Sequence, residues 1–169
     1  MKYKVQSGTL AVKARSRVHD TTTTWCKLSG EVEADADTLA SDGATATFRV
    51  DMTAFDAGDW LKNRKLRKDF DLDTDAAYPT ATFELRAVRD VVRDGAKFTA
   101  NAEGVLAWRG KQVVVKLAGR GTLDGMGLEA TAAFELDIKQ LGLAAPRFLM
   151  FKVEDEVAVE VTVRGAVTQ

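Results

Sequence analysis

The chain has 169 residues, of which 46% are hydrophobic and 29% are charged, and its formal net charge is −1. This balance is that of an ordinary folded domain, which excludes a largely disordered chain. The small net charge gives no indication of a nucleic-acid partner. We therefore expect a single domain over residues 1–169, with no nucleic acid bound to it.

Polar and apolar residues alternate from the beginning of the chain. Leu10, Val12 and Ala14 share one face of a first strand, and Lys13 and Arg15 share the other. Alternation with a period of two predicts half-buried strands, because successive side chains of a strand point to opposite faces. It places Cys26 and Ala87 on inward faces of later strands. The further alternating runs cover residues 26–34, 46–52, 81–87, 98–108, 113–123, 128–138 and 157–167.

One segment interrupts this alternation at residues 59–70. Asp59 is a suitable N-cap, basic residues follow it, and Leu66 and Phe70 are spaced to share a helix face. We predict a short helix that lies across one end of the fold. Extended structure resumes at Tyr78, because a residue that precedes proline favours the β region.

Short turn sequences join the later runs. Asp94-Gly95, Arg109-Gly110 and residues 124–127 supply the glycines that tight hairpins need. Hairpins make consecutive strands antiparallel. About eight such strands form either a sandwich or a closed barrel, and closure removes the exposed edges. The sequence thus predicts an all-β fold, an eight-stranded antiparallel lipocalin-like barrel with one short helix.

The inward faces carry many small residues, among them Gly119 and Ala130. A barrel of about eight strands can be filled by its side chains or can hold one small ligand, and both alternatives stay open here. No charge lies on the inward strand faces, so a guest would be apolar. The candidate ligand-binding residues on the strands are Val12, Phe48, Met52, Phe83, Leu85, Ala100, Ala102, Leu106, Trp108, Val115, Leu117, Ala132 and Phe134.

The connection 141–151 is unusually apolar for a loop, so its side chains must be buried somewhere. It could cap the barrel and line a ligand through Phe148 and Phe151, form the interface of a homodimer, or cover a small satellite core. A filled barrel that acts as a stress-response or protein-interaction module, docking through 141–151, is the alternative function.

The predicted helix is strongly basic. Arg64 and Lys65 are candidates for contact with an anionic headgroup, and the helix could also attract a membrane surface. The alternative is a solvated basic face without a partner.

Catalytic and metal-binding residues are scarce. His19 is the only histidine, and its neighbour Asp20 would point to the opposite strand face. One histidine and one cysteine cannot supply a zinc site, and Cys26 is interpreted as a small inward residue. We expect no enzyme activity, no metal and no cofactor.

No apolar run is long enough to span a bilayer, and Met1–Val5 lacks the apolar core of a signal peptide. We expect a cytoplasmic protein from the chain as it stands. A chain whose signal had been removed would be periplasmic.

Several motifs occur in order along the chain: Asn63-Arg64, Leu66, Asp69-Phe70, Tyr78-Pro79, Phe83, Gly104–Leu106, Gly110-Lys111, Ile138–Leu143 and Val153–Val159. Their order and spacing resemble those of the YceI-like family of lipocalin-like, polyisoprenoid-binding bacterial proteins, and the resemblance extends from Tyr3 to Val167. Lys65 and Asp71 stand where the family usually carries an acidic residue and a second phenylalanine. The resemblance implies an elongated barrel around a lipid tunnel, transport or storage of long isoprenoids or isoprenoid quinones, and no enzymatic activity.

Overall fold

The computed structural model describes residues 1–16, 20–35, 44–70, 72, 78–143 and 154–168, and only the backbone of 147–148 and 151–152. The described chain is dominated by β-strands, with one α-helix and one short 3-10 helix. The strands are β1 (Lys2–Ala14), β2 (Thr21–Trp25), β3 (Leu28–Glu33), β4 (Thr45–Asp51), β5 (Phe55–Asp56), β6 (Thr80–Asp94), β7 (Lys97–Trp108), β8 (Lys111–Leu123), β9 (Gly127–Asp137), β10 (Arg147–Phe148), β11 (Phe151–Lys152) and β12 (Glu156–Thr168). The helices are α1 (Trp60–Asp69) and the 3-10 helix η1 (Ile138–Leu141).

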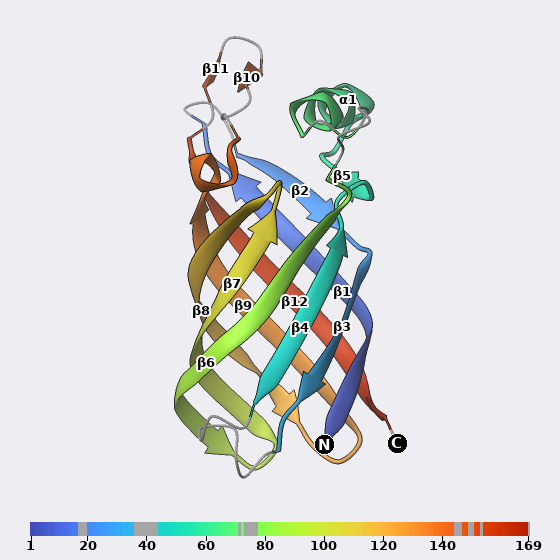
Figure 1. Cartoon of the computed structure of the whole chain (residues 1–169), viewed down its shortest axis with the longest axis vertical. Helices are drawn as coiled ribbons and strands as arrows, with labels where there is room; N and C mark the ends of the chain where they lie inside the picture. The colour runs from blue at the N-terminus through green and yellow to red at the C-terminus, as the bar shows by residue number, and fades with distance from the viewer. Residues whose placement is uncertain are drawn as a thin grey trace.

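The strands close into an elongated barrel (Figure 1). Its order is β12-β9-β8-β7-β6-β4-β3-β1, and β1 pairs with β12 to complete the circle. All pairs are antiparallel, and β2 and β5 extend the wall at one end. The prediction of an eight-stranded antiparallel barrel with one helix is confirmed. Helix α1 and η1 lie at one end of the barrel, called the α1 end below, and both chain termini lie at the other.

The predicted hairpins also occur. Arg109 and Gly110 both have positive φ angles, 57° and 73°, as a two-residue turn between β7 and β8 requires. In the β8–β9 hairpin the Asp124 carboxylate accepts hydrogen bonds from the backbone N–H groups of Met126 (2.8 Å) and Gly127 (3.0 Å). These two bonds hold the pKa of Asp124 below its ordinary value.

Local irregularities change which side chains face inward. In β6 the register shifts between Leu85 and Ala87, so Ala87 pairs with Glu103 and Val88 faces the interior. The inward placement of Ala87 was therefore wrong, because a bulge inserts one residue and reverses the alternation.

The second predicted strand is interrupted. Trp25 ends β2 and is buried, Leu28 begins β3, and Cys26 between them is exposed. The inward placement of Cys26 was wrong. The odd-numbered residues of β2 face the interior, whereas after the break the even-numbered residues of β3 do so.

Helix α1 begins as predicted at the Asp59 cap, whose carboxylate accepts a hydrogen bond from Lys62 N at 2.8 Å. Asn63 fixes the helix to the residue that follows β5, because its side-chain oxygen accepts a hydrogen bond from the backbone N–H of Ala57 at 2.6 Å. Leu66 is buried beneath the helix. These contacts place α1 over one end of the barrel.

Candidate functional site

The interior of the barrel is hollow. It contains an apolar cavity of about 340 Å³, a volume within the usual range of small-molecule sites. Small residues such as Ala102, Gly119 and Ala130 contribute to its wall, so the larger side chains opposite do not fill the space. The sequence left a filled and a hollow barrel open, and the structure has the hollow one.

Nearly all described candidate residues lie on this cavity wall. The exception is Val115, which is buried in the core cluster that contains Leu141 and Leu143. That these residues contact a ligand stays a prediction. The side chains of residues 144–151, which include Phe148 and Phe151, lie outside the described part of the structure. The candidates on the wall are Val12, Phe48, Met52, Phe83, Leu85, Ala100, Ala102, Leu106, Trp108, Leu117, Ala132 and Phe134.

The wall also contains residues that sequence reasoning missed. Thr21, Thr23 and Trp25 project inward from β2, and the two threonines are buried. The alternating run Thr21-Thr23-Trp25 was the available signal, but the polar threonines concealed it. Trp25 is anchored by a 3.4 Å hydrogen bond from its indole N–H to the carbonyl oxygen of Met52.

An aromatic cluster covers the α1 end of the cavity. The Phe70 ring contacts Trp108 edge to face, with centroids 5.3 Å apart, and lies 5.7 Å from Phe55 and 6.3 Å from Trp25. Helix α1 thereby places Phe70 over the interior.

Arg109 holds this cover in place from the β7–β8 turn. Its Nη1 donates to the carbonyl oxygen of Phe70 at 3.0 Å, and its Nε donates to that of Leu141 at 3.3 Å. The guanidinium also lies over the rings of Tyr78 and Trp108, 5.7 and 5.8 Å from their centroids. One side chain thus joins the ends of α1 and η1.

The opposite end of the barrel is sealed. Tyr3 is only 2% exposed and packs with Ala34, Leu123 and Leu128. Its hydroxyl donates to the carbonyl oxygen of Asp124 at 2.8 Å, and burial is the main cause that raises its pKa.

Among the charged side chains of α1, only Asp69 lies on the cavity wall. Asp69 lines the cavity, and its Oδ2 has no hydrogen-bond partner among the described residues. Lys65 Nζ lies 3.7 Å from this oxygen, and Arg64 is exposed. Neither Arg64 nor Lys65 lines the cavity, and their contact with a headgroup stays a prediction.

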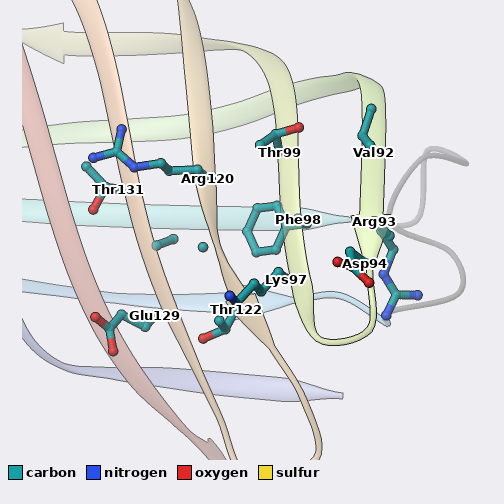
Figure 2. Close-up of a pocket in the computed structure, with 12 residues that line it drawn as sticks. Val92, Arg93, Asp94, Lys97, Phe98, Thr99, Arg120, Thr122, Glu129 and Thr131 are labelled. Carbon is teal, nitrogen blue, oxygen red and sulfur yellow. The ribbon is translucent and has the colours of Figure 1, made fainter.

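A second hollow, of about 540 Å³, lies on the outer surface along β6–β9 (Figure 2). Arg93 and Asp94 line this hollow from the β6–β7 hairpin. Arg120 of β8 and Glu129 of β9 line it farther along the wall. The side chains do not converge on a common point, and Arg93 and Glu129 bind Gly95 and Arg164 respectively. This hollow is an open surface with mixed charge and no evident chemistry.

His19 lies outside the described residues. Among the residues that are described, no three His, Cys, Asp or Glu side chains form a cluster that could hold a metal ion. None of the helices described here has the length and apolar character to cross a membrane.

Structural comparison finds the same architecture in solved proteins. Burkholderia cenocepacia BcnA is 23% identical, with a TM-score of 0.75 over 93% of this chain and 95% of its own. A polyisoprenoid-binding domain from Saccharophagus degradans, implicated in plant cell wall breakdown, is 15% identical, with a TM-score of 0.75 over 98% of both chains. The YceI protein of Campylobacter jejuni is 11% identical, with a TM-score of 0.65 over 87% of this chain and 85% of its own.

Because these sequence identities are low, the three structures establish the fold of this chain and nothing more. A search of curated proteins gave no match. The family model for the YceI-like domain matches residues 3–164, which is nearly the whole chain. With its closed barrel, hollow apolar interior and this match, the chain belongs to the YceI-like domain family.

Proposed function

We propose that this protein binds a long-chain isoprenoid or a similar apolar lipid inside its barrel, for storage or transport, and catalyses no reaction. The main observation in support of this proposal is the apolar cavity, which is closed by Tyr3 at one end and covered by Phe70 at the other. The family membership supports this function, as does the similarity to the polyisoprenoid-binding domain of Saccharophagus degradans.

The chemistry of the wall favours an apolar chain. Each methylene group that moves from water to such a wall contributes about 0.8 kcal/mol, so a long chain gains affinity from its length. The strands supply no charged side chain to the wall, and Asp69 of α1 is its one charged member among the described residues. A polar head would thus remain near α1, with the tail extending toward Tyr3.

The experiment is a titration of the purified protein with a long-chain isoprenoid alcohol and an isoprenoid quinone, monitored by thermal stability. A bound ligand at a hundredfold excess over its dissociation constant should stabilise the protein by about 2.7 kcal/mol. The test variant is Ala132→Trp, which adds a ring to the cavity wall. Its matched control is Ala133→Trp, which adds the same ring to an exposed position of the same strand.

We expect Ala132→Trp to fold and to lose most of the ligand-induced stabilisation, and Ala133→Trp to keep it. In a filled core the same overpacking would cost about 1–3 kcal/mol. The proposal fails if the unmodified protein is not stabilised by either ligand, or if the two variants bind equally well.

A further inference from the structure

The outward face of α1 combines two apolar and two basic side chains. Trp60 is 70% exposed and Leu61 is 62% exposed, and Arg64 and Lys68 are exposed as well. At about 100° per residue, positions 60, 61, 64 and 68 fall within a sector of roughly 100° on the helix. The four exposed side chains therefore form one continuous strip, which we call the outer strip.

The opposite face of the helix is occupied by the barrel. Leu66 is buried, and Leu66, Asp69 and Phe70 line the cavity. This packing fixes the rotation of α1, so Trp60 and Leu61 cannot turn inward without removing Phe70 from its contacts with Trp108 and Phe55. The part of the chain that the structure describes leaves the outer strip uncovered.

The outer strip carries positive charge that the described residues do not neutralise. Of the helix cations, Lys62 lies 3.8 Å from Asp59 and Lys65 lies 3.7 Å from Asp69. Arg64 and Lys68 have no ion pair with a described residue. These two cations, which have no ion pair with a described residue, follow the two exposed apolar residues along the same face of the helix. A face of this kind is complementary to a surface with an anionic outer layer and an apolar layer beneath it.

We propose that the outer strip docks on an anionic phospholipid bilayer. Trp60 and Leu61 enter the boundary between headgroups and acyl chains, where tryptophan is favoured, and Arg64 and Lys68 meet the lipid phosphates. The helix of this chain is only ten residues long and strongly basic, so it lies in the interface and does not cross the bilayer.

Docking in this orientation has a consequence for loading. The inner face of α1 covers the α1 end of the cavity, while the end near Tyr3 is sealed. The bilayer would then meet the end at which an apolar chain enters. This consequence rests on the proposed function, whereas docking itself does not.

The experiment is cosedimentation of the full chain, without added isoprenoid, with vesicles of phosphatidylcholine alone and of phosphatidylcholine mixed with phosphatidylglycerol. We expect binding to the mixed vesicles that weakens as salt is raised. Trp25 and Trp108 are buried. A blue shift of tryptophan emission on binding would therefore report Trp60.

Two pairs of substitutions test the strip. Trp60→Ser with Leu61→Ser should lower vesicle binding about tenfold or more. Arg64→Gln with Lys68→Gln should lower binding to the anionic vesicles about fivefold per cation and leave binding to neutral vesicles unchanged. The matched controls are Met126→Ser, an apolar residue that is 87% exposed at the opposite end, and Lys97→Gln with Arg120→Gln on the barrel wall.

Docking is overturned if the unmodified chain stays in the supernatant with anionic vesicles, or if the control variants lose as much binding as the strip variants. It is also overturned if the chain is a dimer that Trp60→Ser with Leu61→Ser converts to a monomer, since a second copy would then cover the strip. A chain that binds vesicles but is not stabilised by isoprenoids would overturn the proposed function and leave docking intact.

Discussion

The phenyl ring of Phe70 meets the indole ring of Trp108 edge to face, with centroids 5.3 Å apart and planes inclined by 72°. The contact joins the end of α1 to the end of β7. Trp108 is itself held by a 2.8 Å hydrogen bond from its indole N–H to the carbonyl oxygen of Tyr78. The helix therefore packs against a side chain that is fixed on the barrel.

Replacing Phe70 by alanine should loosen α1 and destabilise the protein by about 2 kcal/mol. This loss is smaller than that at a fully buried site, because the Phe70 side chain is half-buried. Urea denaturation measures the loss, and a red shift of Trp108 emission would accompany it. Phe70→Leu keeps most of the buried area and should lose less than half as much. Equal stability of the alanine variant and the unmodified protein would show that Phe70 does not hold the helix.

Two inward glycines of β8 should respond differently to the same added methyl group. A Cβ on Gly121 would collide with the backbone carbonyl oxygen of Glu129, whereas the nearest atoms to a Cβ on Gly119 are 3.8 Å away. Gly121→Ala should therefore destabilise the protein by about 1–3 kcal/mol. Gly119→Ala should be neutral or slightly stabilising, because glycine within a strand is unfavourable. Urea denaturation of both variants checks this, and equal effects would contradict the close approach of β9 at Gly121.

Two like-charged side chains face each other near the start of β12. The hydrogen bond and charge of Glu135 raise the pKa of Glu156 above its ordinary value of 4.5. Between about pH 4.5 and the raised pKa, Glu156 keeps its proton in the folded protein and loses it in the unfolded chain. The free energy of unfolding therefore falls as the pH rises through this range.

Glu156→Gln removes this repulsion and should raise the melting temperature at neutral pH, with little change at a pH below 4.5. Melting curves over a pH series measure the difference. Glu160→Gln, at an exposed position of the same strand, is the control. If both variants gave the same pH profile, the effect would come from net charge and not from the Glu135–Glu156 pair.

Arg64→Gln with Lys65→Gln tests the predicted headgroup contact, in solution and without vesicles. Affinity for an isoprenoid phosphate should fall while affinity for the neutral isoprenoid alcohol stays the same. Arg64 is exposed and Lys65 lies beside Asp69, so the expected loss is about 0.5–1 kcal/mol and not that of a shielded contact. Isothermal titration at low and high salt measures it, and an equal loss for both ligands would remove the headgroup role.

The sequence determined the strands and most of the wall, because alternation is a local property that each strand carries in its own residues. The run from Phe98 to Trp108 predicts β7 and its inward face, and Asp59 with Leu66 and Phe70 predicts α1. Local turn chemistry likewise predicted the β7–β8 hairpin at Arg109-Gly110.

Only the tertiary structure decided where that alternation reverses and whether the barrel is hollow. The bulge in β6 moved Ala87 off the wall and brought Val88 onto it, and the break after Trp25 exposed Cys26, since both depend on pairing with a neighbouring strand. The free volume depends on how opposite walls face each other across the barrel. Contacts between segments distant in sequence, such as Phe70 with Trp108, set the position of α1, and no local pattern encodes that distance.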